Sequence, residues 1–97
     1  MEAIEPGVVY DLKNFNTDSY QRLTFVSKGP EGFIKGTTNE EVVNMMIDRF
    51  YSLQKRSFSV ENQVIIENLK GVRRMLAKRL TNKVEKLKDS NRYVSSN

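Results

Sequence analysis

The sequence predicts an α+β protein in which a short N-terminal β-hairpin or small sheet precedes a long antiparallel helical hairpin that assembles into oligomers. Residues 59–88 contain no proline and one glycine, and their apolar residues recur at steps of three and four, as on one side of a helix. Residues 39–54 repeat this pattern, whereas residues 23–35 combine β-branched and aromatic residues with turn-forming ones. We treat residues 1–97 as one domain, with an extended arm and β-hairpin over 1–36 and the helical hairpin over 37–97.

The N-terminal third is expected to be extended. Residues 1–21 hold scattered apolar positions among Asp and Asn, which favours an extended arm or an irregular edge strand. Residues 23–26 and 33–35 are short apolar runs, and residues 27–32 between them contain a Gly-Pro turn. They predict a β-hairpin, which needs support from other elements because an isolated hairpin is barely stable.

The first helix is expected from Asn39 to Gln54. Gly36 ends the preceding strand, and Thr37 or Thr38 with the glutamate three residues later forms a capping box. The connection over residues 55–58 is short enough to make the next helix an antiparallel neighbour. The residues of the first apolar stripe are Val43, Met46, Ile47, Phe50 and Leu53.

The second helix is expected from Ser59 to about Lys88, with Ser59 or Ser57 as its cap, and is followed by a polar, frayed tail over 89–97. At about 1.5 Å per residue, thirty residues make a rod of roughly 45 Å, too long for this small chain to cover. The rod therefore needs a neighbour, which we expect to be another copy. Its apolar stripe consists of Ile65, Leu69, Val72, Leu76, Leu80, Val84 and Leu87, with Ala77 beside it.

Composition restricts the possible functions. The chain has neither cysteine nor histidine, so we expect no disulfide, no zinc–thiolate site and no Ser-His or Cys-His nucleophile. No apolar run is long enough to span a bilayer and the acidic start is no signal peptide, so we expect a soluble intracellular protein. The net charge of +4 is uneven, because residues 70–92 carry nine Lys or Arg and two acids, whereas residues 1–69 carry seven and ten. This distribution indicates an anionic partner, or simply a solvated helix face.

Binding is a better hypothesis than catalysis, since the acids do not form a convincing acid–base pair and no phosphate-binding Walker loop is present. The junction between the helices offers an aromatic platform in Phe58, an amide in Asn62 and a basic group in Arg56, with Arg79 and Lys83 farther along. These groups are of the kinds that bind a nucleotide. Alternatively, Phe58 only packs against the end of the hairpin and Asn62 only caps a turn.

Residues 36–85 resemble the helical hairpin of two related phage immune-evasion proteins, the Thoeris anti-defence and anti-CBASS sponges. The likeness rests on an acidic helix start after Asn39, an Ile-x-Arg-aromatic centre over 47–50, and Glu61-Asn62 opening the second helix. An aliphatic run and the Lys78-Arg79 pair follow at the same separation.

The resemblance implies a non-enzymatic protein without cofactors, active in the cytoplasm of the infected host bacterium. Such sponges bind cyclic nucleotide second messengers, such as cyclic ADP-ribose isomers and cyclic oligonucleotides, in pockets between the subunits of a homo-oligomer, here a dimer to hexamer. By position, Asn62 would contact the base or ribose, and Arg79 with Lys83 would contact phosphates. Leu53 or Phe58 would supply the platform for the base.

Two other functions remain possible from the sequence. A small nucleic-acid-binding protein would lay the basic helix along phosphates, and its binding would weaken steeply with salt. A phage adaptor or inhibitor of a host protein would use the long helix only to oligomerise or to dock on its target. We expect no membrane partner.

Overall fold

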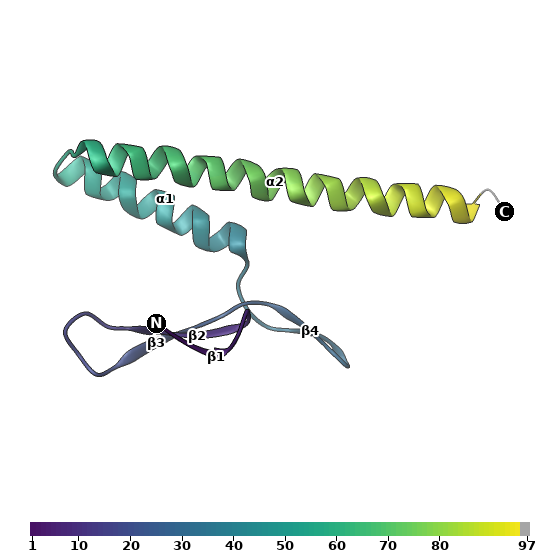
Figure 1. Ribbon diagram of the computed structural model, residues 1–97, viewed down its shortest axis with the longest axis horizontal. Coiled ribbons are helices and arrows are strands. Elements are labelled where there is room, and N and C mark those ends of the chain that lie inside the picture. Colours follow the sequence, from purple (N-terminus) through teal and green to yellow (C-terminus); the bar gives the residue numbers. More distant parts are fainter. Residues whose placement is uncertain (96–97) are drawn as a thin grey trace. The chain divides into compact units, whose positions relative to one another are not determined.

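The computed structural model describes the backbone of residues 1–95 and the side chains of residues 1–88 (Figure 1). It confirms the α+β class, with small antiparallel sheets followed by a helical hairpin. The chain divides into two compact units, Met1–Val42 and Val43–Asn97, which we describe separately. The elements are β1 (Glu2–Glu5), β2 (Val9–Lys13), β3 (Tyr20–Thr24), β4 (Ser27–Gly29), β5 (Gly32–Ile34), α1 (Asn39–Arg56) and α2 (Val60–Ser95).

The first sheet is antiparallel, in the order β1-β2-β3. A four-residue turn joins β1 to β2, in which the Val8 N–H donates to the Glu5 carbonyl at 2.9 Å and Gly7 has φ of 82°. This geometry is that of a type II turn, which favours proline followed by glycine, as found at positions 6 and 7. Between β2 and β3, Asn16 adopts a left-handed φ of 55°, which asparagine tolerates better than most residues.

The expectation for residues 1–21 was therefore wrong in part, because they form β1, β2 and the start of β3 instead of an irregular arm. The expected hairpin around the Gly-Pro turn exists, but its first strand is β4, not residues 23–26. Gly29 pairs with Gly32, so that only Pro30 and Glu31 form the loop. The backbone pairing of residues 27–29 overrides their turn-like composition.

Within the N-terminal unit, the backbone of Phe25 and Val26 lies close to that of Gly36 and Thr37. Phe25 forms an isolated parallel bridge with Thr37, and the Val26 N–H donates to the Thr37 carbonyl at 2.8 Å. A Cβ on Gly36 would collide with the backbone of Phe25 and Val26. A glycine at position 36 is thus required by the close approach of two backbone segments.

The helix starts match the capping pattern of the sequence. The Glu41 N–H donates to the Thr38 hydroxyl at 3.2 Å, and the Asn62 N–H donates to the Ser59 hydroxyl at 3.0 Å. The prediction of Thr38 and Ser59 as caps is confirmed. α1 ends two residues after the expected Gln54.

α1 and α2 pack against each other through a small apolar core. Among the described side chains, only Ile47 on α1 and Ile66 on α2 are buried apolar residues, with 5% and 0% of their surface exposed. α2 continues to Ser95, beyond the expected end near Lys88. The frayed tail was expected over 89–97, of which residues 96–97 and the side chains of 89–95 lie outside the described part.

Candidate functional site

The junction between α1 and α2 is held by one side chain. The Gln54 Oε1 accepts a hydrogen bond from the Ser59 N–H at 2.9 Å, and its Nε2 donates to the Ser59 carbonyl at 3.0 Å. Ser59 in turn caps α2, so the first turn of α2 is fixed relative to the end of α1. Asn62 is half-buried in this turn, whereas 70% of Phe58 is exposed.

The exposure of Phe58 bears on its role. A phenyl ring that only closed the end of the hairpin would be covered by it, and this ring is largely open to solvent. The Asn62 side chain has no hydrogen bond among the described contacts, since only its backbone N–H is engaged by Ser59. Both side chains are therefore available to a ligand or a partner.

α1 carries a shallow hollow of about 450 Å³, lined by residues of this helix only. Two of the predicted site residues, Leu53 and Arg56, line it. Its charges are mixed, because Asp48 accompanies the two arginines. The other lining residues are Met45, Asp48, Arg49 and Ser52.

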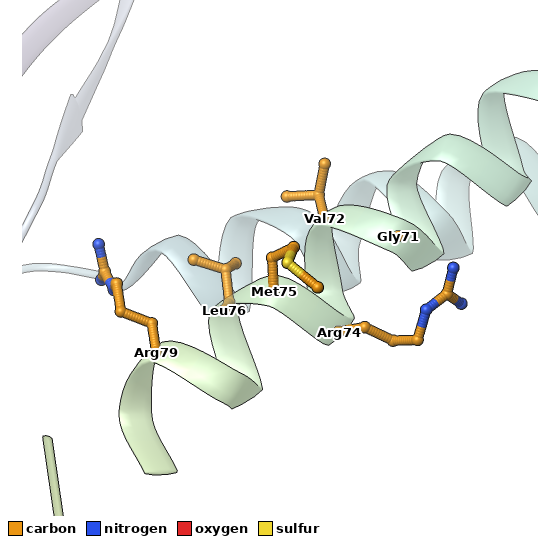
Figure 2. Close-up of a pocket in the computed structure, with 6 residues that line it drawn as sticks. All are labelled: Gly71, Val72, Arg74, Met75, Leu76 and Arg79. Carbon is orange, nitrogen blue, oxygen red and sulfur yellow. The ribbon is translucent and has the colours of Figure 1, made fainter. Parts of the chain in front are cut away.

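α2 carries a second open hollow, of about 580 Å³, which includes Arg79. Figure 2 shows Val72, Met75 and Leu76 between two arginines, Arg74 and Arg79, whose guanidinium groups point in different directions. Gly71 completes the lining, and no acidic side chain takes part. Every lining residue belongs to α2, so α1 forms no wall of this hollow.

The six predicted residues do not converge within one chain. Leu53 and Arg56 lie at the α1 hollow, Phe58 and Asn62 at the junction, and Arg79 at the α2 hollow, with Lys83 one turn farther on. Asn62 and Arg79 are 17 positions apart on a helix, which corresponds to about 25 Å along its axis. One ligand can contact both residues only if they come from different chains.

The basic side chains of α2 are largely uncompensated. Among the described side chains, the ion pairs are Arg22 with Asp11 and Lys70 with Glu67, so neither Arg79 nor Lys83 takes part in one. The Lys70 ammonium lies 5.4 Å from the centre of the Tyr51 ring. Interaction with Tyr51 raises the pKa of Lys70; burial opposes this with a smaller effect, and the nearby Glu67 carboxylate adds to the rise. Lys70 is thus engaged with α1, whereas Arg79 and Lys83 are free to bind anions.

Sequence reasoning did not identify Gln54 as the clamp of the junction, nor Gly71 and Met75 as parts of a hollow. Gln54 follows the apolar stripe of α1 directly and precedes the turn, a position from which an amide can reach the next helix cap. The sequence did not single out Met75 or Gly71 as site residues, because neither belongs to the apolar stripe of the second helix.

No helix within residues 1–95 is long and apolar enough to cross a membrane. No group of three or more acidic, histidine or cysteine side chains in this part of the chain could hold a metal ion.

Comparison of the chain with protein families, curated proteins and solved structures finds no match.

Proposed function

We propose that this protein binds cyclic nucleotide second messengers without chemically changing them, and so withholds them from the effectors of a bacterial anti-phage defence. The observation that carries the proposal is the α2 hollow, which pairs an apolar floor with Arg74 and Arg79 and has no acidic lining residue. The likeness of residues 36–85 to the phage sponges also supports it. The site of action would be the cytoplasm of the infected bacterium.

The chemistry of the exposed groups suits such a ligand. An arginine can hold a phosphate through two parallel hydrogen bonds, which a solvated lysine cannot match in geometry. The exposed ring of Phe58 offers a face on which a base can stack, and the Asn62 amide offers both a donor and an acceptor to a base edge. Together, and shielded between subunits, these groups can reach nanomolar affinity, about 12 kcal/mol.

The basic run along α2 favours a second candidate function, binding of nucleic acid. Residues 70–88 carry eight Lys or Arg and one acid. A helix of this kind can neutralise several phosphates of a polymer without any pocket, and each neutralised phosphate makes the affinity more sensitive to salt. Sensitivity to salt therefore separates the two functions.

The test is calorimetric titration of the full chain with cyclic ADP-ribose isomers, cyclic dinucleotides and cyclic trinucleotides, and with a short DNA duplex, at low and moderate salt. We expect one cyclic nucleotide to bind with little dependence on salt and to be released intact when the complex is heated, as mass spectrometry would show. Binding of the duplex alone, lost at about 0.3 M salt, would favour the nucleic-acid function. Binding of neither would overturn both functions and leave an adaptor.

Variants locate the site. We expect Arg79→Ala and Asn62→Ala each to weaken binding of the cyclic nucleotide at least about tenfold, since each removes a direct ligand contact. Arg73→Ala is the matched control, because Arg73 lies on the same helix but outside the lining of the hollow. All three should keep the solution mass of the wild type. Wild-type affinity in both Arg79→Ala and Asn62→Ala would show that the site lies elsewhere.

A further inference from the structure

Gly71 stands in the interior of α2, where a glycine is unfavourable. α2 runs from Val60 to Ser95, so Gly71 lies several turns from either end and caps neither. A glycine in the interior of a helix costs about 1 kcal/mol relative to alanine, because its backbone loses more freedom on folding. A glycine at this position therefore needs a reason in the packing or in the function of the helix.

Packing within the chain does not supply this reason. Gly71 has an ordinary helical backbone and not the positive φ that favours glycine. A Cβ at this position would meet no backbone of another segment, in contrast to a Cβ on Gly36. Gly71 also lies five residues after the fully buried Ile66, which places it about 140° round the helix from that residue. Contact with α1 therefore does not require a glycine here.

One side chain lies over the open side of Gly71. Among the described residues outside the local helical backbone, only Arg74 comes within 4 Å of the place that a Cβ would take, with its Nη2 at 3.5 Å. Arg74 makes no ion pair with any described side chain. Figure 2 shows Gly71 and Arg74 at one end of the α2 hollow and Arg79 at the other. This end of the hollow thus has an unpaired guanidinium beside a stretch of bare helix.

The space beside this guanidinium suits a phosphate oxygen. An oxygen that accepts a hydrogen bond from arginine lies about 2.7–2.9 Å from the donor nitrogen. The Cβ of an alanine at position 71 would stand 3.5 Å from the same nitrogen, on a side from which such an oxygen can approach. No acidic side chain lines the hollow to compete for the guanidinium. Glycine thus leaves Arg74 open to an anion on this side.

We infer that Gly71 and Arg74 form a seat for one phosphate group of the ligand. The missing side chain of Gly71 makes the room, and the Arg74 guanidinium holds the phosphate. Met75, one turn after Gly71 and 60% exposed, offers adjoining apolar surface to the sugar or base. The seat follows from the geometry of α2 alone, whereas its use for a cyclic nucleotide rests on the proposed function. This role accounts for a glycine at a position where it weakens the helix.

The seat itself is tested with inorganic pyrophosphate, added to the isotope-labelled full chain and followed by NMR. We expect the largest shifts at the Gly71 amide and the side-chain Nε–H of Arg74, and we expect Gly71→Leu to abolish the shift at Arg74. Ala77→Leu is the matched control, because it introduces a leucine at an exposed position of α2 outside the hollow. Equal shifts at all basic residues of α2, no shift, or an unchanged shift in Gly71→Leu would overturn the inference.

Calorimetric titration with the cyclic nucleotide that the wild type binds tests the use of the seat. We expect Gly71→Leu and Arg74→Ala each to weaken binding at least about tenfold, since each removes a charge-assisted hydrogen bond. If the leucine acts by closing the approach to Arg74, the double variant should bind about as weakly as Arg74→Ala alone. Losses that simply multiply would mean that the two residues act independently, and would overturn the shared seat.

Thermal unfolding distinguishes a lost contact from a damaged fold. Gly71→Leu should melt no lower than the wild type, because leucine favours a helix more than glycine does. A lower melting temperature would assign Gly71 to packing and overturn the inference. A pyrophosphate seat in a protein that binds no cyclic nucleotide would leave the inference intact and refute the proposed function. Binding of a cyclic nucleotide that is insensitive to Gly71→Leu would do the reverse.

Discussion

Gln54 holds the backbone of Ser59 at both its N–H and its carbonyl, at 2.9 and 3.0 Å. The last helical turns of α1 are thereby tied to the residue that caps α2. The Ser59 N–H has no helical partner of its own, so Gln54 replaces a hydrogen bond that water would otherwise make there, while the Ser59 carbonyl also accepts from the Gln63 N–H at 3.3 Å. The junction that presents Phe58 and Asn62 is fixed by this clamp.

Replacing Gln54 should loosen the helical hairpin. We expect Gln54→Ala to lower the free energy of unfolding by about 1–2 kcal/mol, because two hydrogen bonds to a half-buried segment are lost. Chemical denaturation followed by circular dichroism measures this change. Gln63→Ala is the control, since Gln63 contacts Gln54 only at 3.4 Å and should cost less. Equal losses in the two variants would contradict the role of the clamp.

Two glycines should respond oppositely to alanine. We expect Gly36→Ala to destabilise the N-terminal unit by about 1–3 kcal/mol, because its Cβ would collide with the backbone of Phe25 and Val26. Gly71→Ala should instead stabilise α2 by about 1 kcal/mol, since its Cβ would meet only the end of Arg74, at 3.5 Å. Thermal unfolding of both variants beside the wild type tests the pair. A stable Gly36→Ala protein would show that these segments do not approach so closely.

The N-terminal sheet should weaken in acid through Asp11. Arg22 is its cross-strand partner and holds its carboxylate by two hydrogen bonds, at 2.8 and 3.0 Å, which lower the pKa of Asp11 below its ordinary value of 3.8. The ionised form therefore favours the folded sheet. Its contribution is complete above the ordinary pKa and disappears as the pH falls through the lowered one.

The measurement is the melting temperature between about pH 5 and pH 2, for the wild type and for Asp11→Asn. We expect the wild type to be the more stable at the upper end and its advantage to vanish at the lower end. Asp18→Asn is a suitable control, because Asp18 makes no ion pair among the described residues. An advantage that persisted at the lowest pH would exclude the Asp11–Arg22 pair as its source.

Phe58→Ala separates the two interpretations of the exposed ring. Because 70% of Phe58 is exposed, its loss should change the free energy of unfolding by less than about 0.5 kcal/mol. If the ring stacks on a base, the same variant should weaken binding of the cyclic nucleotide about tenfold or more. A large loss of stability with unchanged affinity would assign Phe58 to packing.

The helical hairpin was predictable because its signals are local. The hydroxyls of Thr38 and Ser59 accept hydrogen bonds from N–H groups three residues later, and an apolar periodicity follows each of these caps. The strands were harder to predict, since β4 consists of Ser27, Lys28 and Gly29, whose composition is typical of a turn. Pro6-Gly7 was an available turn signal between β1 and β2, and the apolar Val8, Val9 and Tyr10 follow it, but β1 before it has a glutamate at each end and gave no strand signal.

The candidate site was predictable only as a set of residue types. The positions of Asn62 and Arg79 on one helix follow from the sequence, and so does their distance along the axis. The two hollows could not be predicted from the sequence, because they depend on which side chains stay uncovered once α1 and α2 pack together. The position of Gln54 just before the turn is only a weak signal for a clamp, since a glutamine at the end of a helix is usually only solvated.

α2 has 36 residues and α1 has 18, so at least half of the longer helix extends without the shorter one beside it. A single helix of that length is only marginally ordered in water unless something covers its apolar stripe. The far-ultraviolet ellipticity of this protein should thus depend on how much of it is in solution, falling on dilution as the copies separate. Folding of this segment and self-association would then be one equilibrium.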